Sequence, residues 1–206
     1  MACTSVPDER MTSYVDFPET RELTSRTLTL DSALFRYPYR VRVQDDKAVV
    51  FDLHGTEYFF HAFHYPGFHY LSSFGKRGDA PEEMLSAENL RWNGSFLWTL
   101  DSNKSELTRL GFASSGDSLL RLETVSLDEE QLRALDFVQY DDSTFIIPDY
   151  SGDGRFCLVS RQGRLLRKIG TIPTTNEDAL ESARPALAQA WRSFIDYNPH
   201  NGILVA

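Results

Sequence analysis

A repeat of about 48 residues is the feature that most limits the folds open to this chain. Short turns of Asp, Asn and Gly recur 48 residues apart, at Asp45-Asp46, Asn93-Gly94 and Asp141-Asp142. The strand that follows each turn is closed by an aspartate; these residues are Asp52, Asp101 and Asp149, spaced by 49 and 48. A fixed period of this size is typical of arrays in which each unit buries its faces against its neighbours.

Each repeat contains four short strands joined by tight turns. In the first, Tyr39, Val41 and Val43 alternate with polar residues, which predicts a half-buried strand. The strands expected after it are 48–53, 57–65 and 68–74. Burying one aromatic or Leu side chain contributes roughly 1.5–3 kcal/mol. A single unit therefore cannot offset its own ordering entropy, whereas stacked units can.

The same pattern continues to the end of the sequence. Strands are expected at 89–92, 95–100, 105–110 and 119–124, then at 135–140, 144–148, 155–160 and 165–169, and finally at 194–197 and 203–206. Four strands per unit favour a β-propeller over a sandwich. The predicted fold is all-β: about three and a half four-stranded antiparallel blades that do not close a ring. We expect a flexible segment over 1–30 and a partial propeller domain over 31–206.

One segment near 177–192 breaks the strand pattern and predicts a helical insertion. Its apolar residues at helical spacing are Leu180, Ala183, Leu187, Ala190 and Trp191. Thr175 or Asn176 could cap the amino end of the helix. Pro185 lies inside the segment, so we expect a kink or two shorter helices.

Composition excludes some classes of function. The formal net charge of the 206 residues is −9, which argues against a nucleic-acid-binding surface. The two cysteines, Cys3 and Cys157, show no spacing typical of structural zinc, and a disulfide between them is left open. No apolar run has transmembrane length, and no signal peptide is visible. No cofactor is predicted.

Four of the five histidines lie within sixteen positions, at His54, His61, His64 and His69. A tight loop at Pro66-Gly67 would make His64 and His69 cross-strand neighbours on one face. Two imidazoles without a third ligand make a poor zinc site. They are weak candidates for metal binding, and we expect a solvated or aromatic-packed pair.

The stretch Gly75-Lys76-Arg77-Gly78 permits two interpretations. Its backbone could form an anion-binding nest flanked by Lys76 and Arg77. Acidic residues follow at once and would oppose an anion, so we favour a structural corner that uses the conformational freedom of glycine. Both cations remain weak candidates for a binding role.

The recurring acids Asp52, Asp101 and Asp149 also have two interpretations. In a closed ring, equivalent carboxylates surround the axis, where they could bind calcium or act as an acid/base pair. More often such an aspartate accepts backbone hydrogen bonds from its own turn, and we favour that role. No nucleophile motif is present, and no catalytic residue is predicted.

The segment 73–83, SFGKRGDAPEE, resembles a corner motif of the TolB-like six-bladed β-propeller proteins, an envelope-associated bacterial family. Segments 170–173 and 193–206 are similar to the same family, so the resemblance covers about 35–206, the amino-terminal half of a typical member. Ala80 stands where the family often has Gly. The resemblance implies a periplasmic or surface location, with lipidation at Cys3 if the true start lies upstream. It supplies no catalytic residues.

The pattern and the resemblance together predict a non-enzymatic binding or scaffold module of the bacterial cell envelope. The expected partner is a protein or a glycan, with no nucleic acid, and with membrane contact only through an anchor at Cys3. The open edge of the propeller is expected to pair with missing blades or with another chain. The alternative is a propeller-class hydrolase or lyase acting on glycan or peptide, with its site on the axial face of the complete ring.

Overall fold

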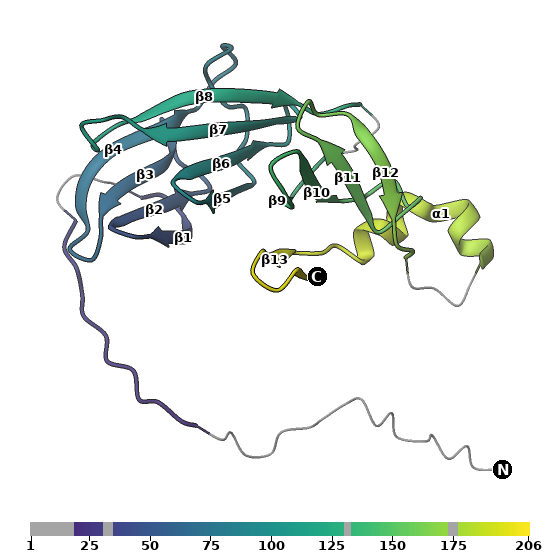
Figure 1. Cartoon of the computed structure of the whole chain (residues 1–206), viewed down its shortest axis with the longest axis horizontal. Coiled ribbons are helices and arrows are strands. Elements are labelled where there is room, and N and C mark those ends of the chain that lie inside the picture. Colours follow the sequence, from purple (N-terminus) through teal and green to yellow (C-terminus); the bar gives the residue numbers. More distant parts are fainter. Residues whose placement is uncertain (1–18, 31–34, 130–132, 173–176) are drawn as a thin grey trace.

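The computed structural model of the chain describes residues 19–30, 35–129, 133–172 and 177–206. In this part the chain forms three four-stranded antiparallel sheets and a two-stranded one, arranged as successive blades (Figure 1). Blade 1 comprises β1 (Pro38–Gln44), β2 (Lys47–Asp52), β3 (Tyr58–His64) and β4 (His69–Lys76). Blade 2 comprises β5 (Asn89–Asn93), β6 (Phe96–Asp101), β7 (Glu106–Phe112) and β8 (Leu119–Ser126).

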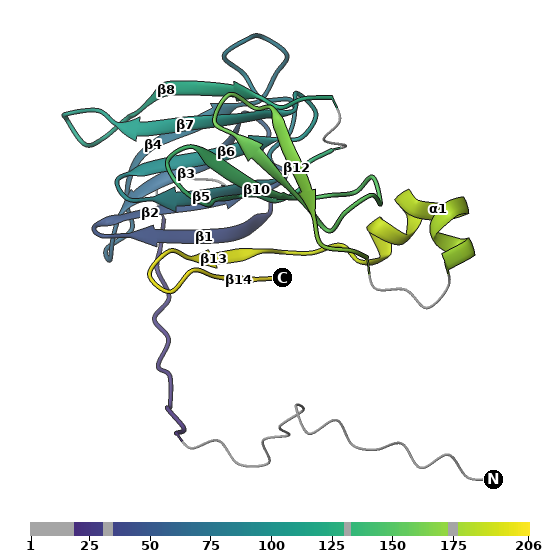
Figure 2. The ribbon, with the colours of Figure 1, turned by 45° about the vertical axis from the view of Figure 1, so that its right-hand side comes forward.

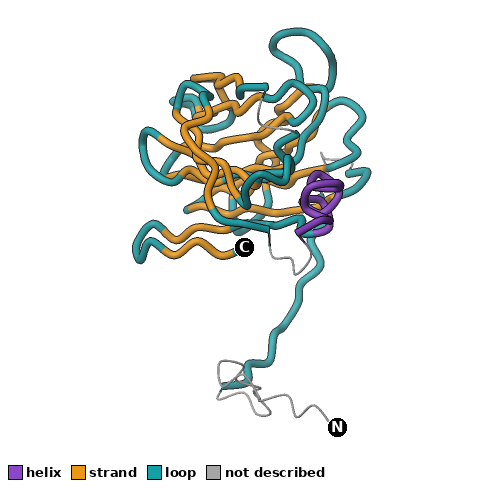
Figure 3. Tube along the Cα trace, turned by 90° about the vertical axis from the view of Figure 1, so that its right-hand side faces the viewer, coloured by secondary structure: helices purple, strands orange, loops and turns teal. Residues whose placement is uncertain are grey.

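Blade 3 and the start of a fourth blade complete the array. Blade 3 comprises β9 (Val138–Gln139), β10 (Thr144–Pro148), β11 (Phe156–Ser160) and β12 (Leu165–Ile169). The strands β13 (Asp196–Asn198) and β14 (Ile203–Val205) form a hairpin that begins the fourth. In each complete blade the strands are hydrogen-bonded in chain order, which is the predicted meander. The predicted incomplete propeller is confirmed, and strands and loops make up nearly all of the described chain (Figure 3).

Two apolar layers hold the blades together. Between blades 1 and 2, Phe60 is fully buried and its ring packs 5.1 Å from Phe51 and 5.2 Å from Phe74. Between blades 2 and 3, Trp98 meets Phe145 edge to face at 5.0 Å. Aromatic pairs in this geometry add to the free energy gained by burial. The stack of blades, not the single sheet, is therefore the stable unit.

The first strand of blade 1 is half-buried, as its alternation predicts, and its polar side is the less exposed one. Val41 and Val43 are 50% and 45% exposed, whereas Arg42 is half-buried on the side of blade 2. The apolar side of this strand faces away from blade 2, where no sheet of the described chain packs on it.

Two further elements differ from their predicted bounds. The strand expected over 135–140 shortens to β9, because Asp136 just before it uses its side chain to hold other segments. The predicted helix is present as α1 (Glu177–Ala190), with Pro185 inside it and a non-helical backbone at Ala183 (φ −140°, ψ 29°). Proline removes one helical hydrogen bond and clashes with the preceding turn, so the predicted kink is confirmed. The predicted caps Thr175 and Asn176 lie outside the described residues.

The segment 19–30 contains neither helix nor strand and runs away from the sheets (Figure 1). At its end Leu30, together with Phe35 and Phe68, packs on the outer face of blade 1. The helix α1 lies at the opposite end of the array, beyond blade 3 (Figures 1 and 2). Among the described residues, no helix is long and apolar enough to cross a bilayer.

Candidate functional site: the axial pocket

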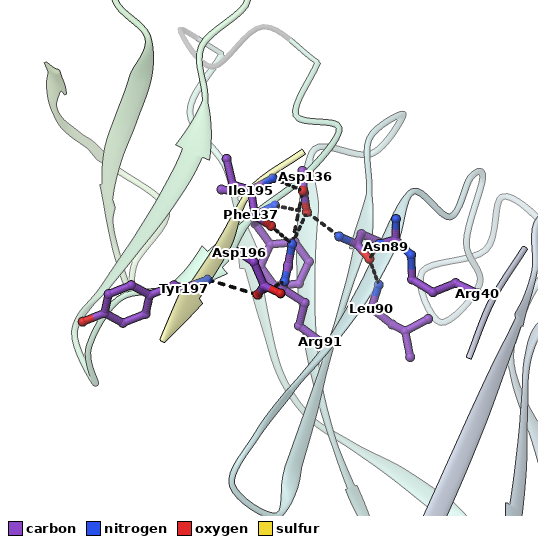
Figure 4. Close-up of polar contacts among 9 residues, drawn as sticks. All are labelled: Arg40, Asn89, Leu90, Arg91, Asp136, Phe137, Ile195, Asp196 and Tyr197. Carbon is purple, nitrogen blue, oxygen red and sulfur yellow. Dashed lines mark hydrogen bonds and ion pairs between the residues drawn. The ribbon is translucent and has the colours of Figure 1, made fainter. Parts of the chain in front are cut away.

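The first strands of successive blades converge on one polar cluster (Figure 4). Arg40 comes from β1, Asn89 and Arg91 from β5, Asp136 from the segment before β9, and Asp196 from β13. These residues lie far apart in the sequence and meet only because the blades are arranged around a common axis. We call them the axial cluster.

Asn89 links three blades through one side chain. Its amide oxygen accepts hydrogen bonds from the guanidinium of Arg40 and, at 2.8 Å, from the backbone N–H of Leu90. Its amide nitrogen donates to the carboxylate of Asp136. Asn89 is 1% exposed, so these contacts satisfy an amide that would otherwise be costly to bury.

Asp136 is the centre of the axial cluster and is 2% exposed. Its two oxygens lie 3.0 and 3.2 Å from one terminal nitrogen of Arg91. The carboxylate also accepts the backbone N–H groups of Phe137 at 2.8 Å and Ile195 at 2.9 Å. Arg91 continues to Asp196 with an ion pair of 2.9 Å and donates to the carbonyl of Ile195. These contacts join the segments before β9 and β13 to β5, and removing one partner of such a buried, hydrogen-bonded charge pair is strongly destabilising.

A pocket of about 400 Å³ opens beside the axial cluster. Aromatic, amide and charged side chains line it, a mixture typical of ligand sites. The aromatic residues are Trp92, Trp98, Phe137, Tyr140 and Tyr197. The polar and charged residues include Arg42, Gln44, Arg91, Gln139, Asp142 and Asp196. We call this the axial pocket.

Arg42 and Arg91 occupy equivalent strand positions but have different electrostatic partners. Arg42 is paired across the sheet with Val49, and Arg91 is paired with Trp98. Arg91 follows Arg42 by 49 residues, and Trp98 follows Val49 by the same number. Arg91 pairs with two carboxylates, whereas Arg42 makes no ion pair or hydrogen bond within the described part of the chain. Burial lowers the pKa of Arg42, the positive charges of Arg91 and Arg40 act in the same direction, and the carboxylates of Asp196 and Asp136 oppose them.

The comparisons with known proteins agree with this architecture. The model of the TolB-like 6-blade propeller-like family matches residues 16–206. The chain belongs to this family. Among curated proteins, no match is found.

The solved structures that resemble this chain do so at low sequence identity. A "Putative exported protein" of Bacteroides fragilis NCTC 9343 has a TM-score of 0.56 at 14% identity over 73% of this chain. A functionally unknown protein of Desulfotomaculum acetoxidans DSM 771 has a TM-score of 0.44 at 12% identity over 64% of this chain. The matched regions cover 42% and 41% of those proteins, so this chain spans less than half of their length.

In this TolB-like chain the recurring aspartates lie at turns, and none of them lines the axial pocket. Asp52 accepts the backbone N–H groups of Arg36 at 2.7 Å and Tyr37 at 2.6 Å. Asp101 receives the equivalent pair of N–H groups in blade 2, 16 and 15 residues before it. Asp149 accepts from Ser151 and lies 3.4 Å from Lys168. The geometry favours the turn-forming role over a ring of ligands.

His64 and His69 are paired across β3 and β4, as the tight loop predicts. Both are exposed, and His64 lies 3.5 Å from Asp46. Among the described residues, no group of three His, Cys, Asp or Glu side chains is placed to hold a metal. A metal role for the pair stays a weak prediction.

The corner formed by Lys76 and Arg77 is held by internal contacts. Lys76 lies 2.7 Å from Glu83, and Arg77 lies over the ring of Phe59 at 5.4 Å. Hydrogen bonding to Glu83 raises the pKa of Lys76 and lowers that of Glu83. Gly75 has a φ of 64°, and a Cβ there would lie 2.7 Å from Phe60, so the corner requires glycine. These contacts support the structural interpretation of the motif.

Cys157 is buried in the apolar layer between blades 2 and 3. Cys3, the predicted lipidation site, lies outside the described residues, and so does any disulfide between the two. Cys157 does not line the axial pocket.

His61 provides a test of the outer face of blade 1. Its Nδ1 lies 2.8 Å from the hydroxyl of Ser73, and its ring meets Phe35 edge to face at 5.2 Å. Burial lowers the pKa of His61 below its usual 6.5, although the charge of Asp52 opposes this.

We expect His61 to make the protein less stable as the pH falls through and below 6.5. The unfolded chain binds a proton on this histidine at a higher pH than the folded chain does, so acid favours unfolding. Urea denaturation between pH 7.5 and 5 should show this loss in the wild type and a flatter profile in His61→Gln. An identical pH profile in the two proteins would show that His61 does not contribute.

Sequence reasoning missed the axial cluster and Arg42. A signal was present, because Arg40 and Asn89 are 49 residues apart and so are Arg42 and Arg91. The spacing of 49 that separates Asp52 from Asp101 also aligns these polar positions on the first strands of blades 1 and 2. The repeat spacing could not show that Asp136 and Asp196 also join the axial cluster.

Proposed function

We propose that this TolB-like chain is a non-enzymatic binding module of the bacterial cell envelope that engages a protein or glycan through its axial pocket. The pocket itself is the observation that carries the proposal. It places aromatic rings beside amide, carboxylate and guanidinium groups, which supply contact area and orientation for a ligand. The family match shows a propeller module and does not specify its ligand.

The hydrogen bonds and ion pairs of Asp136 and Asp196 favour a binding role over a catalytic one. A general acid or base must be free to exchange a proton with the substrate. Asp136 accepts from Arg91 and from two backbone N–H groups, and Asp196 is paired with Arg91. Both carboxylates are therefore committed to holding the blades. A hydrolase or lyase remains the alternative, and turnover of a glycan or peptide substrate would favour it.

The envelope location is part of the proposal. Membership of the TolB-like family and the exported designation of the Bacteroides fragilis protein support it. Lipidation at Cys3 would provide the membrane contact. Mass spectrometry of the mature protein expressed with its native upstream sequence would detect the acyl chains, and an unmodified Cys3 would contradict that part.

The open edge of the propeller is the second proposed contact surface. Ile203 and Val205 are 54% and 62% exposed, and Val41 and Val43 are exposed at the other end of the array. We propose that further blades of the same propeller cover these strands. If the 206-residue chain is monomeric and melts cooperatively, the strands do not need a cover.

Tyr140→Ala should weaken ligand binding about fivefold or more, because truncating an interface tyrosine commonly costs above 1 kcal/mol. Tyr140 lines the pocket, is 45% exposed and contacts the ring of Tyr197 in a tilted arrangement, so its removal should spare the fold. The matched control is Tyr70→Ala, on the outer strand β4, where the tyrosine is 39% exposed.

The measurement uses the full chain on a glycan array and a peptide library, followed by titration of each hit. Hits that lose affinity in Tyr140→Ala and keep it in Tyr70→Ala support the axial pocket. Equal behaviour of the two variants would place binding elsewhere on the molecule.

A further inference from the structure

Arg42 differs from the two neighbouring arginines because it has no polar partner of its own. Arg40 donates to the neutral amide of Asn89, and Arg91 pairs with the carboxylates of Asp136 and Asp196. Among the described residues Arg42 makes no hydrogen bond or ion pair, and the charges of Asp196 and Asp136 act on it only at longer range. A half-buried guanidinium without a hydrogen-bond acceptor is costly, and an acceptor on a ligand would lower that cost.

Three side-chain nitrogens of the pocket-lining residues are buried and have no acceptor among the described residues. They are the Nε atoms of Arg42 and Arg91 and the indole nitrogen of Trp92. Arginine offers five N–H groups, and those of Arg42 are donated to no residue that the structure describes. Because Arg42 lines the pocket, its terminal nitrogens are available to an anionic acceptor that enters there.

The carboxylates in the pocket lining disfavour an anion of higher charge. Asp141, Asp142 and Asp196 line the same space as Arg42, and they would repel a doubly charged phosphate more strongly than a single carboxylate. A carboxylate brings one negative charge and matches the planar fork of a guanidinium. The electrostatics therefore favour a monoanion.

The remaining lining indicates what carries the carboxylate. A sugar hydroxyl both donates and accepts hydrogen bonds. The amides of Gln44 and Gln139 can donate and accept, and the carboxylate of Asp142 can accept. The rings of Tyr140 and Tyr197, 5.2 Å apart, offer apolar faces beside them. A volume of about 400 Å³ is in the range of small-ligand sites.

We propose that the axial pocket binds an acidic sugar, a uronate, whose carboxylate lies on Arg42 and whose hydroxyl groups bind Gln44, Gln139 and Asp142. This inference rests on the proposed function and narrows its ligand to one chemical class. Arg42 is a specificity-determining residue in this scheme, and Arg91 supports the wall behind it.

The test uses digalacturonate and its carboxyl-reduced counterpart digalactose as probes, titrated calorimetrically into the full chain. Digalacturonate should bind the wild type, and Arg42→Gln should weaken it about tenfold or more, since a charge-assisted hydrogen bond is lost. Arg42→Lys should fall between the two, because it keeps the charge without the fork. Arg167→Gln is the control: it removes the same charge from an exposed site on β12 and should change affinity by less than about twofold.

The possible outcomes distinguish a failure of the uronate inference from a failure of the axial pocket as a binding site. If digalactose binds as tightly as digalacturonate and Arg42→Gln changes neither, the carboxylate inference is wrong and the pocket is still a binding site. If a tripeptide with a free carboxyl terminus binds and digalacturonate does not, the sugar assignment is wrong. If both uronate and neutral sugar bind equally well to Tyr140→Ala and Tyr70→Ala, the axial pocket is not the site. If Arg42→Gln unfolds, Arg42→Lys decides the result.

Discussion

Substitution of Asp136 by alanine is expected to lower the free energy of unfolding by about 3–5 kcal/mol, because the buried guanidinium of Arg91 loses its buried partner and keeps only the exposed Asp196. The carboxylate also holds the N–H of Ile195, which leads into β13, so the variant should release the β13–β14 hairpin. Urea denaturation measures the first effect, and amide hydrogen exchange in 195–205 measures the second.

The matched control is Asp196→Asn, which breaks the other ion pair of Arg91. The side chain of Asp196 is 73% exposed, compared with 2% for Asp136. Exposed pairs contribute about 1 kcal/mol or less. If the two variants lose the same stability, burial does not decide the strength of the axial cluster. If Asp136→Ala unfolds with normal protection in 195–205, the hairpin is held by its apolar contacts alone.

The fold was largely predictable because its signal is repeated. Turns that need Asp, Asn or Gly recur at one period, and each unit brings the same pairing of short strands. Repetition lets weak local signals support one another, so errors of a few residues at a strand end do not change the topology. The corner at Gly75 was predictable for the same local reason, since its backbone conformation favours glycine.

The site was not predictable because it depends on contacts across blades. Asp136 bonds to Asn89, 47 residues away, and to Ile195, 59 residues away. Nothing within a window around Asp136 indicates either partner. The buried side of β1 was not predictable for a related reason. Alternation shows that Val41 and Arg42 face opposite ways, but only the neighbouring blade determines which side is inward.

Substitution of Asp101 tests whether the recurring aspartates have a structural or a ligand-binding role. Its carboxylate is 3% exposed and accepts the N–H groups of Leu85, Ser86, Asn103 and Lys104 at 2.7, 3.3, 3.0 and 3.1 Å. These donors come from the entry to blade 2 and from the turn after β6. One side chain thus joins two connections that have no regular strand pairing of their own.

Asp101→Ala is expected to cost about 3 kcal/mol of unfolding free energy, since several buried N–H groups lose their acceptor. Asp117→Ala is the control, because that aspartate lies in an exposed turn and should cost less than about 1 kcal/mol. The two variants should bind a pocket ligand equally well at a temperature where both are folded. If Asp101→Ala instead keeps its stability and loses the ligand, the carboxylate belongs to a binding site, and the repeat marks functional positions rather than structural ones.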